Sequence, residues 1–191
     1  DIGTMRTIPG MTIINPADAV EARAAVEAAI NFNGPVYMRF GRLAVPVIYD
    51  EASYKLEIGR GIKMADGSDV TIIATGVTVA MALEARATLA AEGIDAAVVN
   101  IHTIKPLDRE LVIAEARKTG AIVTAEEHNI IGGLGEAVCA ATAEAYPVPV
   151  LRVGVEDRFG RSGKVPPLLE MYGITPANIA AKAREAVKLK K

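Results

Sequence analysis

The sequence contains no tryptophan, and aromatic residues together make up only 4% of its 191 positions. Small and branched aliphatic side chains must therefore fill the interior, as is typical of helices packed on a parallel sheet. The single cysteine, Cys139, excludes an internal disulfide, and we expect the protein to reside in a reducing compartment, the cytoplasm. We interpret Cys139 as a small buried residue of a helix rather than as a nucleophile.

An excess of charge of one sign and a long hydrophobic run are also missing. The formal net charge is −2 and the charges are interspersed, which argues against a nucleic-acid-binding protein. No apolar run approaches the length of a membrane span, and we expect no signal peptide. Hydrophobic residues nevertheless account for 51% of the chain, which is enough for a sizeable core. We therefore expect a globular protein that contacts neither nucleic acid nor a membrane.

Two blocks of alternating strands and helices are predicted, separated by an irregular segment. In the first block, a strand at 11–14, a helix at 19–30 and a strand at 36–40 make a βαβ unit. Two strands cannot close a doubly wound domain, so this block is predicted to be part of a domain whose other strands lie elsewhere. The segment between the blocks shows no helical period, and we expect a linker with a short hairpin at 56–64.

The second block is predicted to be a mainly parallel, three-layer α/β domain with helices on both faces of the sheet. Its predicted strands are 70–74, 96–101, 121–124 and 150–153, and its predicted helices are 77–91, 109–118, 136–145, 165–171 and 177–188. We divide the chain accordingly into a partial first domain (1–48), a linker with the hairpin (49–68) and a complete second domain (69–191).

A group of ionisable residues, Glu126, Glu127 and His128, follows the predicted strand 121–124. Adjacent carboxylates raise each other's pKa, and a nearby histidine could exchange protons near neutral pH. Adjacent side chains of an extended loop point in different directions, however, so we favour hydrogen bonds to the loop backbone or to a partner subunit. No second histidine or cysteine is spaced nearby to complete a metal site.

Three glycines, Gly132, Gly133 and Gly135, come between this group and the predicted helix 136–145. A helix N-terminus that follows a glycine-rich loop can bind an anion. The spacing is not that of a dinucleotide-binding fingerprint, and close packing of the loop against the helix is the favoured explanation. Together with Glu126 and His128, these glycines are predicted to mark an interface or an anion-binding edge.

Two arginines occupy further candidate positions. Arg42 follows the predicted strand 36–40, and the carboxyl end of such a strand is where ligands of parallel sheets bind. Arginine suits bidentate phosphate contacts, although an ion pair between domains explains Arg42 equally well. Arg158 lies in the loop 157–164, which lacks the spacing of a phosphate-binding loop. There we favour a structural loop with Phe159 in the core over a loop in which Arg158 contacts an anion.

Several stretches together resemble the transketolase family of thiamine-diphosphate enzymes. In the second domain they are DVTIIATG at 69–76, IKPLD at 104–108, EEHNIIGGLG at 126–135 and DRFGRSG at 157–163. In the first domain, NPAD at 15–18 and PVYMRFGR at 35–42 look like the second half of the family's pyrimidine-binding domain. The resemblance covers essentially the whole chain, and the order and spacing of the four later stretches are specific.

The resemblance implies the C-terminal portion of a transketolase: the second half of the pyrimidine-binding domain (1–48) and the transketolase C-terminal domain (69–191). The full assembly would transfer a two-carbon ketol unit between sugar phosphates of the pentose phosphate pathway, using thiamine diphosphate and Mg. The resemblance assigns no catalytic or cofactor-binding residue to this chain. It places only Arg42 on the substrate phosphate, with Gly41 where the family usually has serine.

The partners implied by the resemblance are an N-terminal cofactor-binding transketolase domain or subunit and a second copy of the chain in a homodimer. The chain alone is expected to be inactive and to bind no cofactor. Two alternatives stay open: a non-catalytic dimerisation or regulatory module, and the equivalent part of a deoxyxylulose-phosphate synthase or a 2-oxo-acid dehydrogenase β subunit. Because residue 1 is Asp rather than Met, we expect the N-terminal part to be a separate subunit, proteolytically removed or deleted by design.

Overall fold

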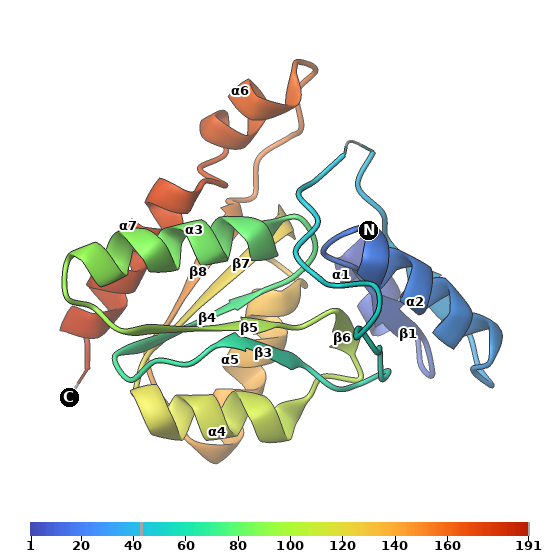
Figure 1. Cartoon of the computed structure of the whole chain (residues 1–191), viewed down its shortest axis with the longest axis horizontal. Helices are drawn as coiled ribbons and strands as arrows, with labels where there is room; N and C mark the ends of the chain where they lie inside the picture. The colour runs from blue at the N-terminus through green and yellow to red at the C-terminus, as the bar shows by residue number, and fades with distance from the viewer. Residues whose placement is uncertain (43, 191) are drawn as a thin grey trace.

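The structure is a computed structural model that describes residues 1–42 and 44–190, and it shows the predicted α/β fold. A five-stranded sheet and a three-stranded sheet form the protein, with helices around them (Figure 1). The helices are α1 (Ile2–Thr7), α2 (Ala19–Ile30), α3 (Thr78–Ala91), α4 (Arg109–Thr119), α5 (Leu134–Ala145), α6 (Val165–Met171) and α7 (Pro176–Lys188). The strands are β1 (Thr12–Ile14), β2 (Val36–Met38), β3 (Ile62–Ala65), β4 (Val70–Ala74), β5 (Ala96–Asn100), β6 (Thr103–Lys105), β7 (Ile122–Asn129) and β8 (Val150–Val155).

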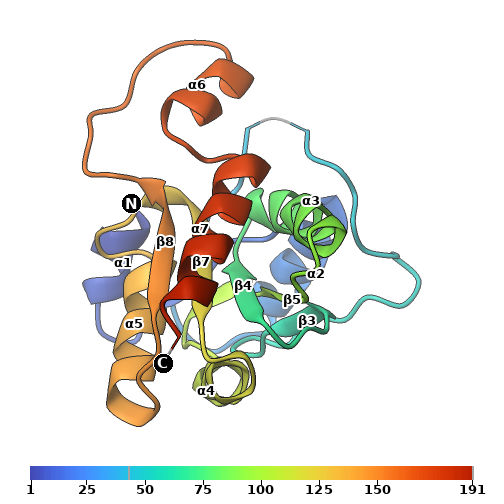
Figure 2. The same cartoon turned by 90° about the vertical axis from the view of Figure 1, so that its left-hand side faces the viewer.

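The larger sheet has the strand order β3-β5-β4-β7-β8 and is parallel except for β3. Helices α3 and α7 cover one face, and α4 and α5 cover the other (Figures 1 and 2). Successive side chains of a strand point to opposite faces, so Ile72 joins the core under α3 and α7 while Ile73 joins the core under α4 and α5. This is the predicted three-layer arrangement.

The smaller sheet has the order β2-β1-β6. Strands β1 and β2 are parallel and connected through α2, which confirms the predicted βαβ unit. Strand β6 comes from the later part of the chain and pairs antiparallel with β1, Ile14 opposite Thr103 and Ile13 opposite Lys105. This pairing, which the sequence does not predict, joins the two parts of the chain through backbone hydrogen bonds.

The predicted hairpin at 56–64 does not form. Its second half is the single strand β3, which pairs antiparallel with the outer side of β5. The physical reason is burial: on the edge of the large sheet, Met64 and Ala65 pack against the core under α3. Gly67 permits the tight return that follows, because a Cβ at this position would overlap the backbone between Ala96 and Ala97.

Strand β7 is longer than the predicted strand 121–124 and includes Glu126, Glu127 and His128, which the sequence places in a loop. Consecutive charged residues are typical of a loop, but here the polar atoms of these side chains have hydrogen-bond or ion-pair partners within the protein. Strand alternation puts Glu126 and His128 on the face opposite Glu127. These residues therefore have fixed directions rather than the variable ones of a loop.

Helix α6 and the loop before it stand away from the body, on the same side as the segment that follows β2 (Figures 1 and 2). No residue of α6 is buried. Phe159 in the loop is 98% exposed, so the expectation that it fills the core is wrong. The loop is instead held by the Tyr172 hydroxyl, which donates to the Phe159 carbonyl at 2.7 Å. Across residues 1–42 and 44–190, no helix is long and apolar enough to cross a membrane.

Helix α7 begins one residue before its predicted start at 177, with a threonine cap followed by proline. The Thr175 hydroxyl accepts a hydrogen bond from the Asn178 N–H at 3.2 Å, and Pro176 occupies the first helical position. We expect Thr175→Ala to lower the free energy of unfolding by about 1 kcal/mol, because it leaves one terminal N–H without its acceptor. Urea unfolding would measure this change, and Thr175→Ser, which keeps the hydroxyl, is the control. Equal stability of both variants would contradict the prediction.

Candidate functional site

Glu126 is fully buried in β7, and its carboxylate caps the start of α5. The two carboxylate oxygens accept hydrogen bonds from the N–H groups of Leu134 and Gly135, each at 2.8 Å. The helix's own N-cap, Gly133, has no side chain for this purpose, and a Cβ there would overlap the Glu126 carboxylate. Burial raises the pKa of Glu126, while the two N–H bonds act in the opposite direction. The anion at this helix terminus is therefore supplied by the chain itself.

His128 joins the end of β7 to α1. Its Nδ1 lies 2.7 Å from the Asn129 carbonyl, which can only accept, so the proton is on Nδ1. Its Nε2 accepts a hydrogen bond from the Gly3 N–H at 3.4 Å. Burial lowers the pKa of His128 and favours this neutral form. Nδ1 is 3.8 Å from a Glu126 oxygen, beyond direct proton transfer, so the two groups do not form an acid–base pair.

Helix α1 also holds the glycine loop. The Arg6 guanidinium donates to the carbonyl oxygens of Gly132 and Gly133, the latter at 2.9 Å. Gly132 has a φ of +77°, and a Cβ there would press on the backbone of Gly3. The glycines thus allow the loop to approach α1 closely, which is the packing that the sequence analysis favours over an anion-binding loop.

Arg158 and His128 both line a cavity of about 400 Å³ between β7, α6 and the loop after β8. The Arg158 guanidinium lies over the Tyr172 ring, 5.4 Å from its centre. Arg39 lines the same cavity and is ion-paired with Glu127 at 3.3 Å. Since Glu126 is enclosed, the interface or anion-binding prediction for this edge depends on His128 and Arg158, and it stays a prediction.

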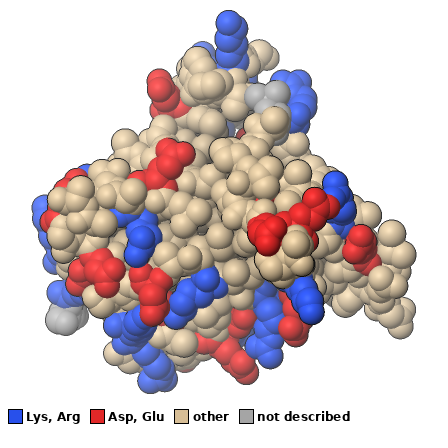
Figure 3. Space-filling model, in the orientation of Figure 1, with Lys and Arg blue, Asp and Glu red and all other residues tan. Residues whose placement is uncertain are grey.

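Arg42 is exposed, in the segment that leaves β2. We call residues 40–47 the Arg42 strap; residue 43 lies outside the described part. The strap, α3 and α6 enclose a second cavity of about 460 Å³, which Arg42 lines together with Glu84 and Glu127. Glu127 is already paired with Arg39, so its charge is partly compensated. Over the face seen in Figure 3, positive and negative side chains are interspersed. Arg42 is thus an exposed cation in the lining of this cavity.

The side chains that the structure describes do not fit a metal-bound diphosphate. Within the described ranges, no group of three or more His, Cys, Asp or Glu side chains is placed to hold a metal ion. Three glutamates are buried within the described ranges, and all are committed elsewhere. Glu126 caps α5, Glu21 accepts from the Tyr54 hydroxyl at 2.5 Å and the Asn100 amide at 2.8 Å, and Glu115 is ion-paired with Lys63 at 2.5 Å. We therefore derive no chemical step through such a group in this chain.

Sequence reasoning misses two residues that organise these sites, Arg6 and Asp18. Asp18 immediately precedes the predicted helix 19–30, and the structure makes it the N-cap of α2. An aspartate before a helix is recognisable as a cap. Its second set of partners, the N–H groups of Ile48 and Tyr49, lies 30 and 31 residues further along the chain and leaves no local signal. Arg6 has no sequence signal either.

The fold and the residue pattern define an α/β domain pair of the kind found in thiamine-diphosphate enzymes. Residues 59–179 match the model of the transketolase C-terminal domain, and residues 1–47 match that of the transketolase pyrimidine binding domain. The chain therefore belongs to the transketolase family and carries the end of the pyrimidine-binding domain followed by the C-terminal domain.

Individual relatives agree with this assignment. The chain is 44% identical over 190 residues to the 6-deoxy-6-sulfo-D-fructose transketolase subunit SqwH of Clostridium sp. (strain MSTE9), covering 100% of this chain and 59% of the relative. It is 43% identical to the 1-deoxy-D-xylulose-5-phosphate synthase of Heliobacterium modesticaldum, covering 97% of this chain and 29% of that enzyme. A solved structure described as a split gene transketolase, inactive beta4 tetramer, has a TM-score of 0.95 and 47% identity, covering 100% of this chain and 61% of that one.

Proposed function

We propose that this chain is the C-terminal part of a split-type transketolase that moves a two-carbon ketol unit from a ketose phosphate to an aldose phosphate. In this proposal an N-terminal domain or subunit holds thiamine diphosphate and Mg, which supply the carbanion chemistry. The chain alone is inactive, acts in the cytoplasm within the pentose phosphate pathway, and contributes to a homodimeric core. The domain division 1–48, 49–68 and 69–191 belongs to the same proposal.

The observation that supports this proposal is the position of Arg42. It follows the last strand of the βαβ unit, is exposed, and lines the 460 Å³ cavity beside α3 and α6. In our proposal its guanidinium contacts the phosphate of the sugar substrate through charge-assisted hydrogen bonds. Binding energy from this remote group would orient the reacting end of the sugar.

We expect Arg42→Ala to raise the KM of the assembled enzyme for a phosphorylated ketose by about 30-fold, because about 2 kcal/mol of charge-assisted hydrogen bonding is lost. The KM for the same sugar without its phosphate should stay unchanged. Arg42→Lys should fall between, since lysine keeps the charge but not the bidentate geometry. Steady-state assays of ketol transfer with both sugars measure these effects.

Absence of ketol transfer from every sugar phosphate donor, with thiamine diphosphate and the N-terminal partner present, would overturn the assignment. The same assays address the second candidate, a deoxyxylulose-phosphate synthase, which the 43% identical relative favours. That enzyme class takes a 2-oxo acid as donor, so condensation of pyruvate with an aldose phosphate would identify it. A 2-oxo-acid dehydrogenase subunit would instead need an acyl carrier as acceptor.

The third candidate is a non-catalytic assembly module. A solved relative that is 47% identical is described as an inactive beta4 tetramer, which favours self-association of such chains without their partner. Light scattering of the isolated chain, followed by titration with the N-terminal partner, would separate the two roles. A self-association state that the partner neither alters nor activates would support the assembly module.

A further inference from the structure

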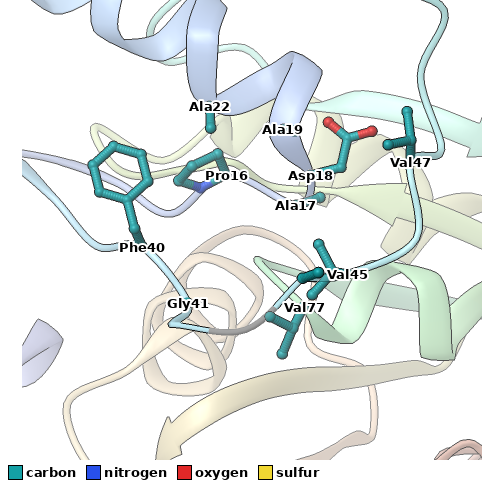
Figure 4. A pocket seen from close by; sticks show the side chains of 11 residues that line it. Pro16, Ala17, Asp18, Ala19, Ala22, Phe40, Gly41, Val45, Val47 and Val77 are labelled. Atoms are coloured by element: carbon teal, nitrogen blue, oxygen red, sulfur yellow. The ribbon is translucent and has the colours of Figure 1, made fainter.

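The Arg42 strap lines a third cavity, which is largely apolar and has a volume of about 370 Å³. Figure 4 shows Phe40, Val45 and Val47 of the strap around this cavity, with Val77, the residue before α3, below and Asp18 at the start of α2. Apolar contacts are non-directional, so this surface does not orient the backbone that carries Arg42 in the way that hydrogen bonds would. Among the described residues, the polar contacts that can supply such a hold lie at the two ends of the strap.

The two ends of the strap are tied by hydrogen bonds. Upstream, the Arg39 N–H donates to the Ile14 carbonyl at 2.9 Å and continues the pairing of β2 with β1. Downstream, the N–H groups of Ile48 and Tyr49 donate to Oδ2 of Asp18 at 2.8 and 3.0 Å. Between these ends, the described strap residues make no backbone hydrogen bond to the rest of the protein. The Asp18 carboxylate is therefore the polar anchor of the downstream end.

Asp18 is only 3% exposed and uses its oxygens for different tasks. Oδ1 accepts the Glu21 N–H at 2.8 Å and caps α2, while Oδ2 holds the strap. Because α2 is the connection between β1 and β2, the cap and the anchor share one rigid element. A carboxylate can accept on both oxygens, whereas an amide presents an acceptor on one side and a donor on the other.

We propose that Asp18 is a positioning residue for phosphate recognition: by anchoring the strap at Ile48 and Tyr49, it holds Arg42 in the lining of its cavity. The inference rests on the proposed function, in which Arg42 contacts the substrate phosphate. Asp18 itself touches no substrate. Its role is to restrict the strap to the arrangement in which the guanidinium is placed before the sugar arrives.

The test compares Asp18→Asn with Arg42→Ala in the assembled enzyme. The asparagine keeps the side-chain volume and the helix cap but turns its NH₂ group toward two N–H donors, so the anchor is lost. We expect the KM for a phosphorylated ketose to rise about 10-fold, with kcat and the KM for the unphosphorylated sugar within about 2-fold of the unchanged enzyme. Hydrogen–deuterium exchange should accelerate in the peptide that contains Ile48 and Tyr49.

Asp108 offers a matched control elsewhere in the chain. It caps α4 by accepting the Leu111 N–H at 3.0 Å, and its other oxygen accepts the linker N–H of Gly61 at 2.9 Å. Asp108→Asn therefore removes the same kind of anchor far along the linker from Arg42. It should accelerate exchange near Gly61 and leave the KM for both sugars unchanged.

The outcomes separate this inference from the function on which it rests. If Arg42→Ala raises the KM for the phosphorylated sugar and Asp18→Asn behaves like Asp108→Asn, the positioning role of Asp18 is overturned and the function stands. If Arg42→Ala has no effect on that KM, the phosphate contact itself fails and the inference fails with it. Should Asp18→Asn not assemble, Asp18→Ser serves the same test, because serine can cap α2 but is too short to reach the strap.

Discussion

Glu126→Ala is expected to lower the free energy of unfolding by about 4 kcal/mol, one of the two largest effects in this protein. The substitution leaves the N–H groups of Leu134 and Gly135 buried without their acceptor and opens a void beside Gly133. Each unsatisfied buried donor costs about 1–3 kcal/mol. Burial raises the pKa of Glu126, so its carboxylate is itself costly to bury, and removing it recovers part of the lost stability. The expected loss is therefore smaller than the maximum for two unsatisfied donors.

Glu127→Ala is the control for this prediction. Glu127 is the next residue of β7, but its carboxylate is partly exposed and forms one ion pair with Arg39. Such pairs contribute about 1 kcal/mol or less. Gly133→Ala should disrupt the same contact between Glu126 and the start of α5, because the added Cβ would displace the Glu126 carboxylate. If urea unfolding shows that Glu127→Ala lowers the free energy of unfolding as much as Glu126→Ala does, the capping role of Glu126 is refuted.

His102→Gln is expected to remove a pH dependence of stability worth about 3 kcal/mol between pH 6.5 and 4. His102 is fully buried at the end of β5, where Nδ1 lies 2.9 Å from the Thr103 hydroxyl and Nε2 has no partner. Burial lowers the pKa of His102 from the ordinary 6.5 to about 4. In the unfolded chain the imidazole takes up a proton below pH 6.5, while in the folded protein it does so only near pH 4.

The direction follows from the protons bound by each state. Between pH 6.5 and 4 the unfolded state binds more protons at this residue, so the stabilising effect of the neutral imidazole is complete above pH 6.5 and is lost as the pH falls. Unfolding free energies measured across this range, for the unchanged protein and for His102→Gln, give the difference. The chain has two histidines, so NMR titration can follow each ring separately, with His102→Gln as the assignment.

Two buried glutamates act in the opposite direction. Burial raises the pKa of Glu21 and of Glu126, so their folded carboxyls hold protons that the unfolded chain has released. Their contribution is complete below the ordinary value of 4.5 and is lost as the pH rises through their folded pKa. Because the unchanged protein and His102→Gln share both glutamates, the difference between their two profiles isolates the contribution of His102. A variant whose profile matches that of the unchanged protein would refute the assignment to His102.

The sequence predicts helix positions well where local chemistry marks them. Asp108 before α4, Gly120 after it, and Thr175 with Pro176 before α7 are caps whose effect depends only on neighbouring residues. The strands β4 and β5 are similarly clear, because each is a run of five buried residues of which four are apolar. These features fix the three-layer arrangement without information from distant parts of the chain.

What the sequence does not predict depends on contacts between distant residues. Strand β6 has three residues, and only β1, about ninety residues earlier, makes it a strand. The extension of β7 through Glu126 depends on the N-terminus of α5, where two N–H groups donate hydrogen bonds to the Glu126 carboxylate. The candidate site divides in the same way: Arg42 is visible at the end of a predicted strand, whereas Asp18 gains its second role only from a segment 30 residues away.

The pairing of β1 with β6 also bears on how relatives of this protein could be recombined. A chimera that exchanges the second domain at the linker would carry a foreign β6 into a sheet whose other two strands come from the original protein. Residues 12–14 and 103–105 should therefore be exchanged together, although they belong to different family domains. Functional crossovers between members of the family should retain both segments from the same parent.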